Sequence, residues 1–309
     1  MSLSDGSVQT QKVEYSAETL GSHHKHGVHA SRSTWRRQQI LINSARLVAV
    51  LIIVLITFVP VVWIFLTGFK SEAEYLASPP VWLPSKPSWT NYIDMWHEGG
   101  FEALMNSLIV TIAGCLLAMV CGVPAAYSLS RFRTGGQNLA NWILSIKFMP
   151  AIAFTIPIAV MFHALRLIDT HSGLILVYGT FNLPFVVWTM KGFIDEIPRE
   201  LDESVMIDGC SRLGAMWWIA LPLSAPGLVT TILMTFIFIW SEFLFALILS
   251  QSQLFTVPVR LSQYYSEAVG LKWGPQAALA TVAILPMVAI AFIGQRYIVR
   301  ALTFGAVKD

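Results

Sequence analysis

Residues 47–66 read LVAVLIIVLITFVPVVWIFL and contain no charged side chain. A helix needs about 20 apolar residues to cross the hydrocarbon core of a bilayer, which is about 30 Å thick, so this stretch predicts a transmembrane helix. The composition of the 309-residue chain agrees, because 55% of its residues are hydrophobic and only 12% are charged. In a soluble domain about a quarter of the residues are charged. This composition excludes a water-soluble globular protein.

Five further apolar stretches follow along the chain, and each is long enough to cross a bilayer. Only two charged side chains, Lys147 and Glu242, fall inside them. We therefore expect an all-α integral membrane protein with six transmembrane helices. Including the first stretch, the expected spans are 47–66, 104–129, 139–165, 172–190, 223–250 and 277–294.

The distribution of basic residues predicts the orientation. Most of the 20 Lys and Arg residues precede the first span, follow the last, or lie in the second and fourth connections. Because basic residues near span ends are retained in the cytoplasm, we expect both termini to be cytoplasmic. The connection at 70–102 is then external, and the connection at 194–224 is cytoplasmic. The six-helix domain would cover residues 44–300, between cytoplasmic tails at 1–43 and 301–309.

The polar tail at residues 1–43 has neither the short apolar core nor the small-residue cleavage site of a signal peptide. We therefore expect the first span to be retained as a membrane anchor. The tail contains His23, His24, His26 and His29. These side chains could hold a metal ion, but no Cys or carboxylate lies beside them, and a solvated, disordered tail explains them better.

Small residues and prolines recur inside the spans. Gly114, Ala118, Gly122 and Ala126 repeat every four residues in the second span, a stripe that lets another helix approach closely. Each proline removes a backbone hydrogen bond and kinks or interrupts its helix. Lipid tolerates such kinks where neighbouring helices or a water-filled cavity satisfy the freed groups. Kinked helices around a cavity suit a transporter, although proline is also generally commoner in membrane helices.

Several catalytic motifs are missing from the sequence. There is no G-x-x-x-x-G-K-[ST] phosphate loop, and there is no H-E-x-x-H, G-x-S-x-G or G-x-G-x-x-G motif. The three Cys residues form neither a disulfide framework nor a zinc site, and a net charge of +2 gives no indication of nucleic-acid binding. We therefore do not expect an enzyme, and transport would take its energy from another subunit.

The connection at 194–224 contains two short helices by its pattern. Pro198 begins the first helix, acidic residues fill its first turn, and Gly209 ends it. Leu201 and Val205 give this helix one small apolar face, and Ser211 can cap the second helix. From the residues alone, a docking element for a cytosolic protein and a purely structural loop both remain possible.

The same connection resembles a family signature. Its residues follow the spacing E-A-A-x3-G-x9-I-x-L-P, the hallmark of permease subunits of binding-protein-dependent ABC importers. In this chain Ser204 and Val205 replace the alanine pair of the motif. The matching positions, including the acid that usually precedes the glycine, are Glu203, Ser204, Val205, Asp208, Gly209, Ile219, Leu221 and Pro222.

Other parts of the chain look like the maltose-type carbohydrate uptake subfamily, and the resemblance covers about residues 44–308. One departure is Ser241, which stands where an Asn usually follows the tryptophan at position 240. The similar stretches are 68–70, 91–92, 106–107, 125–132, 173–176, 184–185, 240–243, 295–296 and 305–308.

The resemblance implies the type I ABC importer permease architecture and a division of labour. This chain would pair with a second, homologous permease as a heterodimer in the bacterial inner membrane. Two ABC ATPase subunits would bind ATP and Mg and hydrolyse the ATP, and an external solute-binding protein would deliver a sugar. The chain itself would bind no cofactor. Its coupling helix would cover residues 203–209, and its tail, Gly305, Ala306, Val307 and Lys308, would reach toward the ATPases.

The candidate residues of the solute path lie inside the predicted spans. Lys147 lies roughly 12 Å into its span at 1.5 Å per residue, at a different depth from Glu242, so the two are not expected to pair. Lys147 would face water, the companion permease or an anionic group on the solute, or it would extend toward the interface. Tyr178, Asn182 and Trp240 could contact a sugar or simply pack between helices. Glu242 is a further candidate for the solute path.

The expected solute is a monosaccharide, oligosaccharide or polyol, with an anionic sugar as a further possibility. The alternative function is a stand-alone secondary carrier or channel for small solutes. Such a protein would need neither partners nor the element at residues 203–222, and it would transport without ATP.

Overall fold

The computed structural model describes residues 27–132, 134–266 and 270–306. These residues are mainly helical, and two short strands, β1 (Tyr265–Ser266) and β2 (Gly270–Leu271), pair antiparallel. The chain divides into two units, residues 1–61 and residues 62–309.

The described part of the first unit is one helix. α1 (Gly27–Thr67) contains the predicted span at 47–66. We expected no regular structure before residue 44, and this was wrong for residues 27–43. No Gly or Pro follows Gly27 in this stretch, and its Arg, Gln and Leu residues favour helix, so the helix of the span extends upstream. The histidines at 23, 24 and 26 lie outside the described residues.

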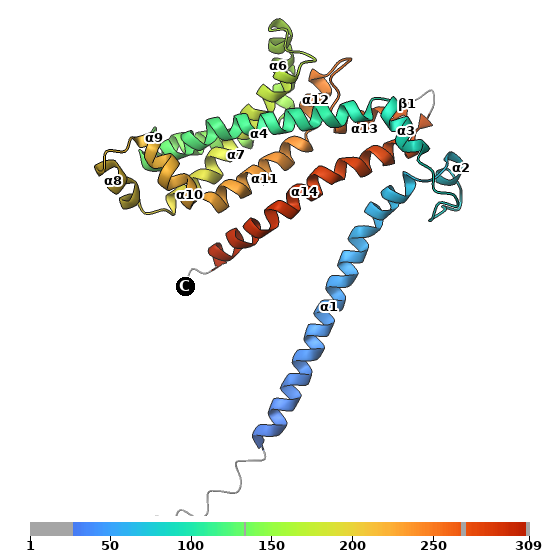
Figure 1. Cartoon of the computed structure of the whole chain (residues 1–309), viewed down its shortest axis with the longest axis horizontal. Helices are drawn as coiled ribbons and strands as arrows, with labels where there is room; N and C mark the ends of the chain where they lie inside the picture. Colours follow the sequence, from blue (N-terminus) through green and yellow to red (C-terminus); the bar gives the residue numbers. More distant parts are fainter. Residues whose placement is uncertain (1–26, 133, 267–269, 307–309) are drawn as a thin grey trace, which may run out of the picture. The chain divides into compact units, whose positions relative to one another are not determined.

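Long helices that lie side by side form the centre of the second unit (Figure 1). Three predicted spans, at 104–129, 172–190 and 277–294, are confirmed as parts of such helices, and each of these helices is long and apolar enough to cross a bilayer. The central helices are α4 (Gly100–Arg131), α7 (His171–Asp195), α11 (Ala225–Trp240) and α14 (Trp273–Ala306).

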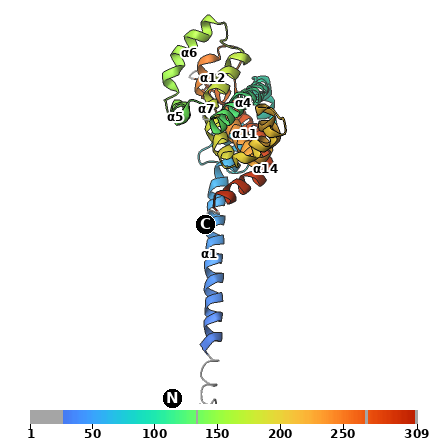
Figure 2. The same cartoon turned by 90° about the vertical axis from the view of Figure 1, so that its left-hand side faces the viewer.

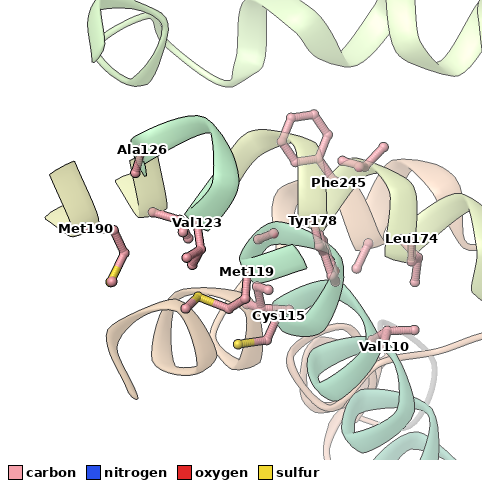
Figure 3. Close-up of a cluster of buried hydrophobic side chains, with 14 of the residues drawn as sticks. Val110, Cys115, Met119, Val123, Ala126, Leu174, Tyr178, Met190 and Phe245 are labelled. Atoms are coloured by element: carbon pink, nitrogen blue, oxygen red, sulfur yellow. The ribbon is translucent and has the colours of Figure 1, made fainter. Parts of the chain in front are cut away.

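The most extensive helix packing among the described residues is between α4 and α7, and it confirms the predicted stripe of small residues. All four residues of the stripe are buried. A Cβ carbon added to Gly122 would lie only 2.6 Å from Cγ1 of Val186 in α7. Figure 3 shows Met119 of α4 gathered with Tyr178 and Met190 of α7 in the same buried cluster.

The predicted span at 139–165 is not one helix. It divides into α5 (Gly136–Lys147) and α6 (Ile152–Ala164), which are bent by 89° relative to each other. Pro150 lies in the break; it has no N–H to donate and disfavours a helical conformation of the residue before it. The expectation that prolines kink or interrupt the spans is therefore confirmed here, and the span is a bent pair of helices.

The predicted span at 223–250 is interrupted as well. α11 ends at Trp240, and α12 (Leu244–Leu249) follows after a short break. At its other end α11 is bent by 83° from the preceding helical segment. Figure 2 shows α12 beside α6, and the two helices are in contact. When each bent pair counts as one span, the described segments that can cross a bilayer number six.

The predicted connections occupy opposite ends of the second unit (Figure 1). The elements of the 194–224 connection gather at one end, and those of the 70–102 connection lie at the other. Which end faces the cytoplasm remains a prediction. The first group is α8 (Arg199–Ile207), α9 (Arg212–Ala215), the π-helical η1 (Met216–Ala220) and α10 (Leu221–Leu223). The second group is α2 (Glu72–Tyr75) and α3 (Thr90–His97), with α13 (Val257–Gln263) nearby.

Candidate functional site

The two short helices of the 194–224 connection have the expected boundaries. Pro198 immediately precedes α8, and Gly209 follows it with a φ of +93°. L side chains rarely adopt this conformation, so a glycine is required for the bend. Ser211 then caps α9, because its Oγ accepts a hydrogen bond from the backbone N of Gly214 at 3.1 Å.

One side of α8 is available to a partner. Glu203, Ser204 and Asp208 are exposed. Ile207, in the last turn, is 85% exposed and lies beside the exposed Asp208. Of the remaining predicted coupling residues, Val205, Ile219 and Leu221 are half-buried, and Gly209 and Pro222 are exposed.

The other side of α8 contains a feature that the sequence did not indicate. Asp202 is buried and forms an ion pair with Arg131, the last residue of α4. In the sequence, Asp202 is only one of the acidic residues of the first turn of this helix. Val205 and Met206, at i+3 and i+4 from Asp202, are half-buried, so the inward face is centred on Asp202. Of the two residues of the expected small apolar face, Val205 is half-buried and Leu201 is exposed.

Further polar contacts join α8 to the ends of α4 and α7. Nη2 of Arg199 donates to the backbone O of Ser130 at 2.8 Å. Oγ of Ser130 donates to Oδ1 of Asp195 at 2.5 Å, and Lys191 pairs with the other oxygen of Asp195. Three separate segments of the chain therefore meet in one polar cluster at this end of the bundle.

The second candidate site brings together two residues that the sequence treated separately. Nζ of Lys147, at the end of α5, donates to Oδ1 of Asn182 at 3.3 Å and to the backbone O of Phe181 at 3.4 Å. The same Nζ lies 5.4 Å from the ring centroid of Phe238. Asn182 in turn donates to the backbone O of Tyr178 at 2.9 Å. Within the described part of the chain, Lys147 has no carboxylate partner, Glu242 included.

Glu242 and Trp240 have different surroundings. The carboxylate of Glu242 accepts hydrogen bonds from the backbone N of Phe245 at 3.0 Å and of Ala246 at 3.3 Å, and thereby caps the start of α12. It is also within electrostatic reach of the buried Tyr178. Trp240 is buried in a different apolar cluster, stacked on Phe236 with ring centroids 5.8 Å apart.

The predicted tail can be followed only in part. Gly305 and Ala306 are the last backbone positions of α14, and Val307 and Lys308 lie outside the described residues. Among the residues that the structure describes, no three His, Cys, Asp or Glu side chains gather as a metal site.

Comparison with known proteins gives a consistent result. Residues 102–304 match the family described as "Binding-protein-dependent transport system inner membrane component". The sulfoquinovosyl glycerol transport system permease protein of Agrobacterium fabrum is 32% identical, over 85% of this chain and 93% of its own length. The trehalose/maltose transport system permease protein of Thermococcus litoralis is 30% identical, over 88% and 99%.

The fold is also found among solved structures. A chain of a bacterial ABC transporter involved in the import of the acidic polysaccharide alginate aligns with a TM-score of 0.70. The alignment covers 84% of this chain and 98% of that chain, at 21% sequence identity.

Proposed function

The chain belongs to the family of binding-protein-dependent transport system inner membrane components, and we propose that it is the permease subunit of an ABC importer for a sugar or sugar derivative. As a member of this family it is a multi-pass inner-membrane protein that works with ATPase and solute-binding partners. The named solutes of the relatives in Agrobacterium fabrum and Thermococcus litoralis, both sugars or sugar derivatives, support the substrate class.

The observation that carries the coupling assignment is the exposed side of α8. In this proposal Glu203, Ser204 and Asp208 contact an ATPase subunit, and Ile207 fills an apolar position of the contact. The bend at Gly209 and the cap at Ser211 give α8 a fixed direction relative to α9. The tail residues 305–308 would reach toward the same pair of ATPases. ATP and Mg would be bound by those subunits.

A second, homologous permease would complete the translocation path in a heterodimer. The exposed apolar side chains of α5 and α6, such as Trp142, Ile156 and Val160, suit either lipid or helices of this companion. The external solute-binding protein would contact the opposite end of the bundle from α8, where the 70–102 connection lies. This arrangement requires the predicted orientation, with α8 in the cytoplasm.

Lys147 and Asn182 are the best candidates for contact with the solute. Two of the three donors of the ammonium group are used in long hydrogen bonds to neutral oxygens, so the charge itself is not neutralised by a protein carboxylate. Charged groups in a membrane span are costly and usually serve a function. We propose that Lys147 binds a hydroxyl or an anionic group of the sugar. Tyr178 is buried in an apolar cluster within electrostatic reach of Glu242, and the packing of Trp240 on Phe236 favours a structural role.

The test is uptake in proteoliposomes that contain this chain, its companion permease and the ATPase subunits. Radiolabelled sugars are offered with the solute-binding protein outside, and ATP is enclosed inside. We expect uptake that requires both ATP and the binding protein. Uptake by this chain alone, without ATP, would instead establish a stand-alone carrier and refute the importer assignment.

A further inference from the structure

The ion pair between Arg131 and Asp202 differs from the other ion pairs among the described residues. Its two side chains are 5% and 3% exposed, whereas those of Lys272 and Glu98 are 44% and 31% exposed. Exposed pairs contribute little to stability. A buried pair is costly to form, and removal of one partner leaves an uncompensated charge. The burial of these two charges at a helix junction therefore needs an explanation beyond stability.

The surroundings of Arg131 fix its position from two sides. Asp202 of α8 is its direct partner, and Asp195 at the end of α7 is within electrostatic reach. Asp195 is itself held by Ser130, the neighbour of Arg131 in the chain. Arg199 of α8 reaches back to the carbonyl of Ser130. The first turn of α8 is thus bonded to the last turn of α4, and that turn is bonded to the last turn of α7.

The helices behind this junction are packed closely enough to move together. α4 and α7 are in contact along the stripe of small residues, where Gly122 and Val186 leave no space for a methyl group. Packed interiors of this kind shift between discrete arrangements and do not deform continuously. A displacement of α8 would therefore be passed to the end of an α4–α7 unit.

We propose that Arg131 and Asp202 are positioning residues that couple α8 to the α4–α7 unit, so that motion delivered to the exposed side of α8 moves the transmembrane helices. This inference rests on the proposed function of α8 as the coupling helix. It adds the contact between α8 and the rest of this chain. Glu203 and its neighbours face the partner, and Asp202, one residue before Glu203, holds the helix to the bundle. Without the ion pair, α8 would follow its partner while α4 remained in place.

The experiment measures the number of ATP molecules hydrolysed per sugar imported by the reconstituted complex. Arg131→Met and Asp202→Asn each remove one charge, and the double variant R131M/D202L removes both and leaves no unpaired buried charge. Glu196→Gln removes an exposed charge at the same end of the bundle, without breaking an ion pair among the described residues, and is the matched control. We expect the ATP-to-sugar ratio to rise on the order of tenfold in the three variants of the buried pair and to stay at the wild-type value in Glu196→Gln.

The double variant separates positioning from stability. If the pair only stabilises the fold, R131M/D202L recovers both the thermal stability and the wild-type ATP-to-sugar ratio, which would overturn the inference. Recovery of stability with a raised ratio supports it. A proportional loss of ATPase activity and uptake in every variant would also overturn it. A wild-type complex without ATP-dependent uptake would refute the proposed function itself, so the two failures are distinguishable.

A second measurement follows the position of α8 directly. Spin labels are placed on the exposed Cys121 of α4 and on Glu200→Cys, an exposed position of α8, after Cys115 and Cys210 are replaced by alanine. In the assembled complex we expect the distance distribution between the labels to broaden in R131M/D202L and to remain narrow in Glu196→Gln. An equally narrow distribution in both variants would contradict a positioning role.

Discussion

Gly122 of α4 lies so close to Val186 of α7 that a Cβ carbon at position 122 would stand 2.6 Å from Cγ1 of Val186. Gly122→Ala must therefore separate the two helices or force Val186 out of its rotamer. We expect a loss of about 1–3 kcal/mol in the free energy of unfolding, which is the usual cost of overpacking a core. Thermal unfolding of the purified protein in detergent measures this loss.

The matched control is Gly192→Ala, which lies in α7 on an exposed part of the helix. No atom outside the local helix lies within 4 Å of a Cβ carbon at this position. Alanine favours a helix over glycine by about 1 kcal/mol, so this variant should be as stable as the wild type or slightly more stable. Equal destabilisation by both substitutions would contradict the close α4–α7 contact.

A single carboxylate organises the loop that follows α12. Asp169, between α6 and α7, accepts hydrogen bonds from the backbone N of Gln251, Ser252, Gln253 and Leu254 at 3.0 to 3.4 Å. Burial opposes the ionisation of Asp169, but these donors outweigh it and lower the pKa of the carboxyl below its usual value. The stability that it contributes is therefore present above the ordinary pKa of about 3.9 and is lost as the pH falls through the lowered pKa of the folded state.

Asp169→Asn tests this account without a change of backbone preference. The φ of Asp169 is +58°, and Asn accepts the left-handed conformation at least as readily as Asp. We expect the variant to lose at least about 1 kcal/mol at pH 7, since the charged acceptor becomes neutral and the NH₂ group of Asn cannot accept the hydrogen bonds made to the second carboxylate oxygen. The difference in melting temperature between variant and wild type should shrink as the pH approaches 3. A difference that is independent of pH would show that the charge of Asp169 does not hold the loop.

The sequence was most informative where one physical requirement decides the structure. The apolar length of α4 and α7 predicted the spans, because a helix satisfies every backbone polar group in lipid. The repeat from Gly114 to Ala126 predicted their close packing, because small residues let a second helix approach. At α5 and α6 the sequence indicated an interruption by proline, but hydropathy is continuous across Pro150 and does not indicate the size of the 89° bend. The sequence also missed the partner of Asp202, because Arg131 is 71 residues away in the chain and first-turn acids have a simpler explanation in the helix dipole.

The proposed contact of Glu203 with an ATPase subunit can be tested without a change in the fold of α8. Glu203→Gln removes a charge at an exposed position of α8, so the thermal stability of this chain should not change. Recovery of the ATPase subunits with the permease should fall at least about tenfold, because losing one partner of a charge pair buried at an interface costs about 2–5 kcal/mol. Co-purification from membranes measures the effect.

Glu200→Gln is the control for this substitution. Glu200 lies in the same helix, is also exposed, and is not part of the motif of coupling residues. We expect wild-type recovery of the ATPase with this variant. If Glu200→Gln and Glu203→Gln reduce recovery equally, the interaction depends on the total negative charge of α8, and Glu203 has no special role.

Substitution of Lys147 tests whether the solute carries a negative charge. Its ammonium group reaches Asn182 and the carbonyl of Phe181 but has no carboxylate partner among the described residues. If an anionic group of the solute supplies the missing partner, Lys147→Met should reduce uptake of an acidic sugar by about tenfold or more, since a hydrogen bond to a charged group contributes about 1.5–3 kcal/mol. Uptake of a neutral sugar should change little. Lys147→Arg keeps the charge and should retain most of the uptake of the acidic sugar. Equal uptake of that sugar by the wild type and by Lys147→Met would contradict a contact between Lys147 and the solute. The hydrogen bonds of Lys147 would then serve only the packing of the helices.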